Sequence, residues 1–423
     1  MDDILVTIGC VTYNQKDYIR DALDGFLKQK TNFKFEIFVY DDASTDGTSD
    51  ILMEYAERYP ELFRIYISDH NRWRDVDRRR FLHELRCKNW RGKYVALCEG
   101  DDYWIDEHKL QIQADYMEAH PECSMYIHNC CKLNCEDNVL SSEDIFPIEG
   151  EKDIPAEQLI REKNGHPPTA SYFYRKELMF KDFFFFNASV GDYPLVLCAA
   201  AHGTVHYSSR KMSVYRWKAR GSYTTKIMTN LEFFFFFSIG VIDFLVKYNE
   251  YTKKRYEQTV IDRINEFAGG FAEMFRSQNI ELAEEYKKMK ESGYYLDDTC
   301  IELLPKMEAF LLNVTSNYLS ESIKKFIQNY KNIIIMGTGK YSQILTEQLE
   351  YNRIPFHGYA VSSLDTDRKM FNGKKIWNLK DIPYSKEDTG VLVGILVKDK
   401  EDIINSLNQA DIKNFCLPFE FIL

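Results

Sequence analysis

The stretch KYVALCEGDDYW, residues 93–104, places three carboxylates directly behind a short apolar run. Residues 94–98 have the composition of a buried strand, and Glu99, Asp101 and Asp102 follow it within four positions. Carboxylates this close together repel one another, and a cation shared between them relieves that repulsion. The stretch therefore predicts a buried strand that ends in a site for a cation.

Strands and helices alternate on the N-terminal side of this stretch. Apolar residues recur at helical spacing in DYIRDALDGFLKQ, whereas β-branched and aromatic residues fill the runs between the helices. The predicted strands cover residues 4–14, 35–44, 63–68 and 93–98, and the predicted helices cover 17–29, 50–60 and 79–92. This alternation predicts an α/β fold with a mostly parallel sheet covered by helices.

Polar side chains close three of the predicted strands. Tyr13 and Asn14 end the first strand, Asp41 and Asp42 end the second, and the carboxylates of residues 99–102 end the fourth. Ligands of parallel α/β sheets bind beyond the carboxyl ends of the strands. We therefore expect these groups to meet at one edge of the sheet.

The remainder of the chain divides into two parts. Residues 226–327 read as helical and are interpreted as a connector. Residues 328–423 begin with a strand, a Gly337-x-Gly339 turn and a helix, which predicts a small Rossmann-like βαβ domain. Ser342 stands where a dinucleotide fingerprint has its third glycine, and the next strand ends without an acid for the ribose. A structural role, or a nucleotide or partner bound at residues 337–340, is therefore favoured over a dinucleotide.

The composition bounds the class of protein. A net charge of −11 and an isoelectric point near 5.5 argue against a nucleic-acid partner. The local exception is RWRDVDRRR, residues 72–80, which either meets a phosphate or forms a solvated loop. The ten cysteines lack the spacing of a disulfide framework, and HNCCKLNC, residues 128–135, lacks the paired C-x-x-C spacing of a structural zinc site.

One apolar run raises the question of a membrane. FFFFFSIGVI, residues 233–242, is ten residues long, about half of what a membrane-crossing helix needs. Acidic residues on both sides of the run favour a buried or interfacial helix. The N-terminus shows no basic region followed by an apolar segment, so we expect a reduced, cytoplasmic setting.

Three segments, taken in order, resemble a known family. VTIGCVTYNQKDYIRDALDGFLKQ, IFVYDDASTDGT and GKYVALCEGDDYW are similar in order and spacing to the family-2 glycosyltransferases of GT-A fold, over roughly residues 4–225. The resemblance implies a GT-A domain at residues 1–225, ahead of the helical connector at 226–327 and the Rossmann-like domain at 328–423. It also implies an enzyme that takes a nucleotide-sugar, with Mn²⁺ or Mg²⁺ as cofactor.

The resemblance assigns the donor site position by position. Tyr13 and Asp42 match the residues that contact the nucleotide base, and Glu99-Gly100-Asp101 stands for the family's DxD motif. Asp101 then matches the metal-binding aspartate, and Glu99 matches the acid that faces the ribose. Asp102 either supports the metal or faces the acceptor.

The resemblance also implies a catalytic base and a contact to the diphosphate. Asp192 in SVGDYPLVLCAAAHG, residues 189–203, stands at the position of the base that deprotonates the acceptor hydroxyl. The alternative is that Asp192 only caps the helix that starts near Pro194. Arg79 is the predicted contact to the diphosphate, and Lys218 stands where many relatives have a histidine, two residues after the arginine of KMSVYRWKARGSYT.

The acceptor side is assigned from HPPTASYFYR, residues 166–175, which resembles the segment that lines it in the family. His166, Thr169 and Ser171 are the candidates there. Trp104 either walls the sugar pocket or is a half-buried aromatic at its rim.

These residues predict a metal-dependent, inverting glycosyltransferase. The expected partners are a nucleotide-sugar, in particular a UDP-sugar, and a glycan or lipid-linked saccharide acceptor, which would place the enzyme peripherally at the inner face of a membrane. Two alternatives remain open: an inactive GT-A scaffold that recruits partners, and an NAD-dependent oxidoreductase built on Gly337-x-Gly339. A nucleotidyltransferase would need a glycine- and lysine-rich loop after the first strand, where the sequence has VTYNQK.

Overall fold

The structure is a computed structural model, and its described residues form two compact units. It describes residues 4–75, 77–141, 144–146, 148, 150–161, 167–182, 185, 188–278, 288, 291, 319–363, 369–395 and 400–419. The first unit is built from Met1–Phe244 with Ser292–Tyr295, and the second from Leu245–Glu291 with Leu296–Leu423. The three-part division drawn from the sequence remains a proposal.

Four parallel strands form one half of the sheet in the first unit. Their order across the sheet is β3-β2-β1-β4, and a helix follows each of the first three strands along the chain. The strands are β1 (Ile4–Thr12), β2 (Lys34–Asp41), β3 (Phe63–Ile67) and β4 (Tyr94–Leu97), and the helices are α1 (Ile19–Leu27), α2 (Thr48–Arg58) and α3 (Arg78–Asn89). This half confirms the predicted α/β alternation.

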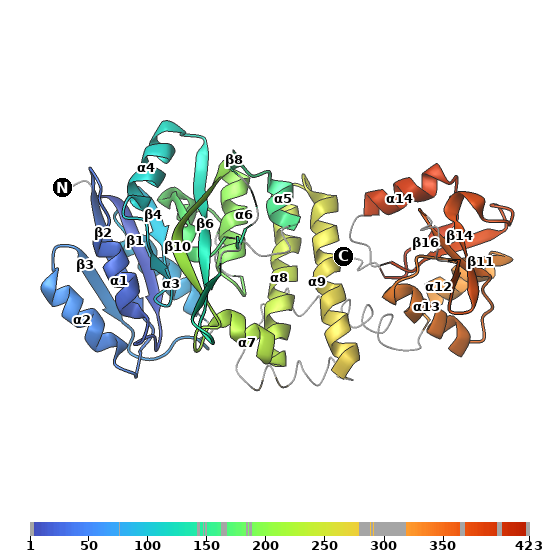
Figure 1. Ribbon diagram of the computed structural model, residues 1–423, viewed down its shortest axis with the longest axis horizontal. Helices are drawn as coiled ribbons and strands as arrows, with labels where there is room; N and C mark the ends of the chain where they lie inside the picture. Colours follow the sequence, from blue (N-terminus) through green and yellow to red (C-terminus); the bar gives the residue numbers. More distant parts are fainter. Residues whose placement is uncertain are drawn as a thin grey trace. The chain divides into compact units, whose positions relative to one another are not determined.

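The sheet continues past β4 with mixed pairing. β9 is antiparallel to β4 and to β6, β10 is parallel to β6, and β5 is antiparallel to β10. Figure 1 shows the sheet passing from the blue strands into these cyan and green ones. The strands are β5 (Tyr103–Trp104), β6 (Cys123–Asn134), β7 (Val139–Ser141), β8 (Glu151–Asp153), β9 (Phe173–Arg175) and β10 (Thr204–Trp217); the helices are α4 (Lys109–Ala119), α5 (Ala156–Arg161) and α6 (Asp192–His202), with 3₁₀ turns at Thr169–Ser171 and Lys176–Phe180.

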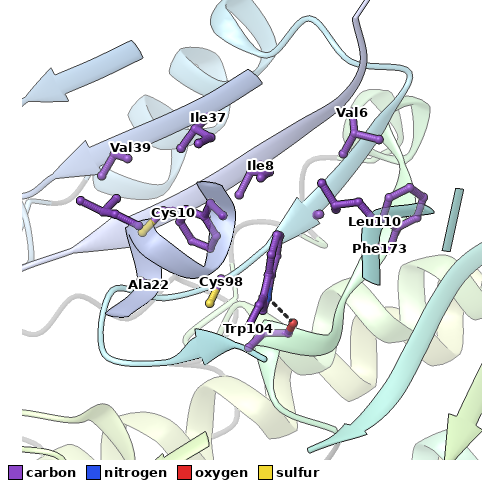
Figure 2. Packing of buried hydrophobic residues seen from close by; sticks show 14 of the residues in the cluster. Val6, Ile8, Cys10, Ala22, Ile37, Val39, Cys98, Trp104, Leu110 and Phe173 are labelled. Atoms are coloured by element: carbon purple, nitrogen blue, oxygen red, sulfur yellow. Dashed lines mark hydrogen bonds between the residues drawn. The ribbon is translucent and has the colours of Figure 1, made fainter. Parts of the chain in front are cut away.

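The core of the first unit follows from the period of its strands and helices. Val6, Ile8 and Cys10 alternate along β1 and are all buried, because every second strand residue points to the same face. Figure 2 shows them packed with residues of β2 and α1, and with Trp104. Fully burying one such side chain contributes about 1.5–3 kcal/mol to folding. This packing holds the carboxyl ends of β1, β2 and β4 at one edge.

Helices fill the region after β10. They are α7 (Tyr223–Thr229), α8 (Leu231–Tyr251), α9 (Glu257–Gln278) and α12 (Glu321–Gln328). At the start of α8, Phe233 and Phe235 are buried, and the Phe233 ring stacks on Trp73 with centroids 5.9 Å apart. No single helix in the described ranges has the length and hydropathy of a membrane span, although the bent pair Tyr223–Thr229 and Phe233–Tyr251 meets that test by length and composition.

The second unit contains a smaller sheet. Five of its strands are parallel in the order β14-β12-β11-β15-β16, which is the doubly wound arrangement expected of a Rossmann-like domain. Its elements are β11 (Asn332–Met336), α13 (Lys340–Tyr351), β12 (Gly358–Val361), β13 (Met370–Phe371), β14 (Lys374–Asn378), a 3₁₀ turn at Leu379–Asp381, β15 (Thr389–Val393), α14 (Lys400–Gln409) and β16 (Phe415–Cys416). Ser342, at the third fingerprint position, is buried and donates to the Gly394 carbonyl at 2.9 Å, so its side chain serves the packing of this domain.

Candidate active site

The acidic loop between β4 and β5 is held against the end of β1. The Cys98 amide donates to the Gly9 carbonyl at 3.2 Å, and the Gly100 amide donates to the Val11 carbonyl at 3.0 Å. Within the loop, the Asp102 amide donates to the Glu99 carbonyl at 3.1 Å. These bonds extend the β1–β4 pairing beyond β4, so the carboxylates emerge at the carboxyl edge of the parallel strands.

Gly100 is required by the closeness of this approach. A Cβ atom at position 100 would lie 2.5 Å from Gln15 Oε1, 2.8 Å from Thr12 Oγ1 and 2.9 Å from Ile19 Cδ1. Gln15 Oε1 in turn accepts a hydrogen bond from Thr12 Oγ1 at 2.7 Å. The glycine therefore lets the loop lie directly on the β1–α1 connection.

The three carboxyl groups of the loop repel one another. Burial raises the pKa of Glu99 to about 8, repulsion from Asp101 and Asp192 adds to the shift, and Arg86 opposes it. Burial raises the pKa of Asp101, and burial together with repulsion from Asp101 raises the pKa of Asp102 well above its usual value. Glu99 is exposed as a residue, so it is accessible to a ligand. A cation bound at the loop would relieve this repulsion.

Asp192 joins this cluster from a distant part of the chain. It is the first residue of α6, whose N-cap is Gly191 and which has no side-chain capping bond; Asp192 Oδ1 accepts the amide of the next residue, Tyr193, at 2.8 Å. Its charge also raises the pKa of Glu99 and of the buried Tyr172 phenol, so the carboxyl group lies near both. Burial among protein atoms raises the pKa of Asp192 itself, although the residue is exposed on its open side. The start of α6 therefore places the Asp192 carboxyl group near the acidic loop.

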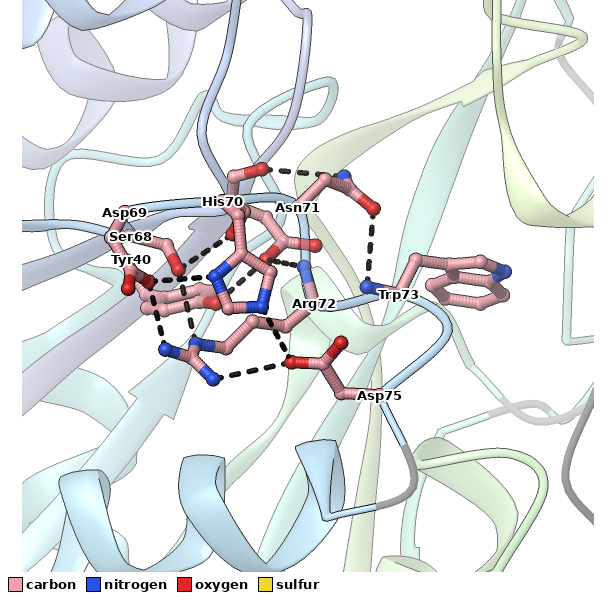
Figure 3. Close-up of polar contacts among 9 residues, drawn as sticks. Tyr40, Ser68, Asp69, His70, Asn71, Arg72, Trp73 and Asp75 are labelled. Atoms are coloured by element: carbon pink, nitrogen blue, oxygen red, sulfur yellow. Dashed lines mark hydrogen bonds and ion pairs between the residues drawn. The ribbon is translucent and has the colours of Figure 1, made fainter. Parts of the chain in front are cut away.

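The predicted base-contacting residues lie at the ends of β1 and β2. Tyr13 is 43% exposed, whereas Asp42 is buried, with Oδ1 accepting the Tyr40 hydroxyl at 2.7 Å and the Arg72 amide at 2.9 Å. Figure 3 shows the polar cluster around Tyr40 and Arg72, in which His70 and Arg72 both bond to Asp75. The Asp42 amide donates to the Thr12 carbonyl at 3.0 Å, which joins the two strand ends.

The basic residues of α3 face the same region. Arg79 Nη1 donates to the Val190 carbonyl at 3.5 Å, two residues before Asp192. Arg86 lowers the pKa of Glu99, and sequence reasoning did not single it out. The sequence did contain a signal for Arg86, because it lies seven positions after Arg79 and therefore on the same face of the helix. Lys218 is turned away: its φ is 60°, and its Nζ pairs with Glu136 at 2.6 Å.

Among the described acceptor-side candidates, Trp104 bonds to the 3₁₀ turn that contains Thr169 and Ser171. Trp104 is 3% exposed, packs edge-to-face on Phe26 at 4.8 Å and donates from Nε1 to the Ala170 carbonyl at 3.0 Å, so it lies in the core and not at a rim (Figure 2). Ser171 is fully buried, and its Oγ has no hydrogen-bond partner among the described residues. Thr169 begins the 3₁₀ turn and is half-buried. His166 lies outside the described residues.

The carboxylates of the acidic loop suit a hard divalent ion whose remaining coordination positions are filled by a bound ligand. Across the described part of the chain, no three His, Cys, Asp or Glu side chains are arranged to hold a metal by themselves. Mg²⁺-type sites commonly use one or two carboxylates together with substrate phosphates. Mutually repelling carboxyl groups at Glu99 and Asp101 fit that chemistry. The cysteines that the structure describes are all free thiols.

Comparison with known proteins assigns one segment of the first unit to a family. The model of the family described as "Glycosyl transferase family 2" matches residues 7–178. This segment is a family 2 glycosyl transferase domain. The match confirms the resemblance seen in the three motif segments, and the family 2 domain carries the acidic loop and α3. Asp192 and β10 lie beyond its matched range.

Relatives of the family 2 domain share only part of their length with this chain. An uncharacterized protein of Mycobacterium bovis is 37% identical over 216 residues, which cover 51% of this chain and 60% of that protein. The putative teichuronic acid biosynthesis glycosyltransferase TuaG of Bacillus subtilis is 34% identical over 113 residues, 27% of this chain and 42% of TuaG. The chain therefore spans less than two thirds of these relatives.

A solved structure shares the fold. S. aureus TarS 1-349 in complex with UDP-GlcNAc superposes with a TM-score of 0.50, covering 83% of this chain and 90% of that chain at 14% identity. At this identity the likeness concerns the fold alone. It supports the GT-A architecture predicted for the family 2 domain.

Proposed function

We propose that the protein is a metal-dependent, inverting glycosyltransferase that moves a hexosyl or N-acetylhexosaminyl group from a UDP-sugar to a hydroxyl group. The observation that carries this proposal is the convergence at Glu99, whose pKa is raised by burial and by the charges of Asp101 and of Asp192, about 90 residues further along the chain. Three carboxylates at the carboxyl edge of a parallel sheet are suited to a cationic metal and its diphosphate partner.

In this proposal the strand ends and helix α3 each contact one part of the donor. Tyr13 and Asp42 contact the base, Glu99 faces the ribose, and Arg79 meets the diphosphate. Asp101 holds the metal, and Mn²⁺ or Mg²⁺ bound there would supply positive charge against the diphosphate leaving group. Asp102, which is buried, supports the metal or faces the acceptor.

Asp192 acts as the general base. The acceptor hydroxyl transfers its proton to the Asp192 carboxylate, the oxygen forms a bond to the anomeric carbon from the face opposite the diphosphate, and the bond to the diphosphate breaks with inversion. The raised pKa of Asp192 makes it a stronger proton acceptor near neutral pH than an ordinary aspartate.

We further propose that the acceptor is a glycan or lipid-linked saccharide, and that the enzyme works in the cytoplasm, peripherally at the inner face of a membrane. The name of the B. subtilis relative, a putative teichuronic acid biosynthesis glycosyltransferase, supports an acceptor in cell-surface polymer assembly. The donor is proposed as a UDP-sugar on the resemblance of the three motifs.

The first experiment is a donor screen that reads UDP, GDP and CMP release separately from a panel of sugar nucleotides, with and without Mn²⁺. We expect Mn²⁺-dependent release of UDP. Release of GDP or CMP alone would show that the donor is a GDP-sugar or a CMP-sugar and not a UDP-sugar. No release from any sugar nucleotide would favour the inactive scaffold.

Two substitutions then separate the base from the metal ligand. Asp192→Asn should lower transfer by about 10²–10⁴-fold and leave UDP affinity near that of the wild type. Asp101→Ala should remove the gain in UDP affinity that Mn²⁺ provides, measured by calorimetry. Asp115→Asn, at an exposed position of α4, is the matched control and should change neither quantity. Unchanged turnover in Asp192→Asn would remove this residue from the mechanism.

A further inference from the structure

Arg216, near the end of β10, contacts the acidic loop through both its backbone and its side chain. Its amide donates to Asp102 Oδ1 at 2.8 Å, and its Nη1 donates to the Asp101 carbonyl at 2.7 Å. The residue is 7% exposed. One residue therefore contacts two consecutive members of the loop, although 114 and 115 positions separate it from them.

The other end of the guanidinium is also engaged. Nη2 pairs with Asp21 of α1, whose side chain is 55% exposed. The guanidinium carbon lies 4.6 Å from the centre of the Tyr103 ring and 5.1 Å from the centre of the Tyr18 ring. The planar fork of an arginine matches this set of partners, whereas a lysine would supply one point charge.

We propose that Arg216 is a positioning residue that clamps the acidic loop between α1 and β10 and so sets the direction of the Asp101 carboxylate. Like charges in the loop push its members apart, and the two bonds from Arg216 hold them in place. Nη1 and Nη2 each bond to the protein, so the proposal assigns this side chain to holding the loop and not to the diphosphate. The inference rests on the proposed function, because it requires the loop to bind a metal and a nucleotide.

The resulting effect is on metal-supported binding. Groups that orient a metal ligand without touching the ion typically affect metal affinity by about 10–100-fold. We expect Arg216→Lys to weaken UDP binding by about tenfold or more when Mn²⁺ is present, and to leave the weaker metal-free binding of UDP nearly unchanged. An arginine that held the diphosphate directly would instead affect UDP binding with or without the ion.

Asp21→Asn provides a second variant that does not depend on a buried residue. It removes the charge that orients the guanidinium from an exposed position on α1, so the fold is retained. We expect a smaller loss of Mn²⁺-supported UDP affinity in the same direction. In the double variant the loss should equal that of Arg216→Lys alone, because both substitutions act through one contact.

The matched control is Glu54→Gln, which breaks the exposed Arg20–Glu54 pair between α1 and α2 at 2.6 Å. Calorimetric titration with UDP, with and without Mn²⁺, measures the UDP affinity of the full chain in the wild type and in the four variants: Arg216→Lys, Asp21→Asn, the double variant and Glu54→Gln. An Asp21→Asn variant equal to the wild type, or an Arg216→Lys loss that persists without Mn²⁺, overturns the clamp. A wild-type chain that fails to bind UDP with Mn²⁺ overturns the proposed function and this inference together; wild-type binding with unaffected variants overturns the inference alone.

Discussion

Replacing Gly100 with alanine tests whether the acidic loop must lie directly on the β1–α1 connection. The added methyl group would come within 2.5 Å of Gln15 Oε1 and 2.8 Å of Thr12 Oγ1. Those two atoms are hydrogen-bonded to each other, so the two side chains must shift together or break that bond to make room. Ile19 Cδ1, at 2.9 Å, closes the third side from the buried face of α1.

The magnitude follows from the cost of overpacking. One extra methyl group in a tightly packed site typically destabilises the fold by about 1–3 kcal/mol. Losing the Thr12–Gln15 hydrogen bond contributes about 0.5–1.5 kcal/mol to that cost. If the loop moves outward to avoid the clash, the Gly100–Val11 bond lengthens and the carboxylate of Asp101 shifts with it. We therefore expect both a lower stability and a weaker Mn²⁺-dependent affinity for UDP.

Urea unfolding measures the first effect, and calorimetry with UDP and Mn²⁺ measures the second. Gly191→Ala is the matched control, because its backbone φ is −104° and no atom lies within 4 Å of the added Cβ. We expect this control to change the free energy of unfolding by less than about 1 kcal/mol. A Gly100→Ala variant with wild-type stability and wild-type UDP affinity would refute the close approach described for the loop.

Two other predictions concern the charge and the packing of the same unit. Because the pKa of Glu99 is about 8 in the folded protein and near 4.5 in an unfolded chain, the folded state binds more protons between these values, and stability should fall as pH rises from 5 to 8. Glu99→Gln should flatten that slope in urea titrations, and saturating Mn²⁺ should offset the fall; a slope unaffected by both would contradict the shift. Trp104→Ala should lower the free energy of unfolding by about 3–5 kcal/mol, because it empties a core site against Phe26. If Trp104→Ala instead preserved stability and altered only acceptor use, the indole would belong to the site and not to the core.

The parallel half of the sheet was predictable from sequence because its cause is local. Helical and strand periods are visible in each segment, and parallel strands deliver their carboxyl ends to one edge. The meeting of Asp42 with the end of β1 follows from those two facts alone. The family resemblance then supplied Asp192, which neither period nor spacing connects to the acidic loop.

The remaining features depend on pairings that no local pattern reveals. Trp104 follows two acids in the sequence, but the antiparallel pairing of β5 with β10 places it opposite Ser213 and turns its ring into the core. Lys218 adopts a left-handed backbone conformation that sends its side chain to Glu136. The direction of Arg216 depends on the register of β10 against β6, which brings together segments about 80 residues apart. Side-chain direction at such positions is a property of the assembled sheet.

The acidic loop is held by residues that lie far apart in the sequence, and this affects when the loop becomes ordered during synthesis of the protein. Asp21, Asp101 and Arg216 are contributed by three segments spread over 195 positions, so the loop is braced only once β10 has been made and paired. Contacts of this range form late, after the entropy of closing long loops has been overcome. A ribosome-bound or truncated chain that ends before residue 204 would carry every acid of the loop without its brace. On the proposed function and clamp, such a chain would bind UDP with Mn²⁺ about tenfold or more weakly than the finished first unit.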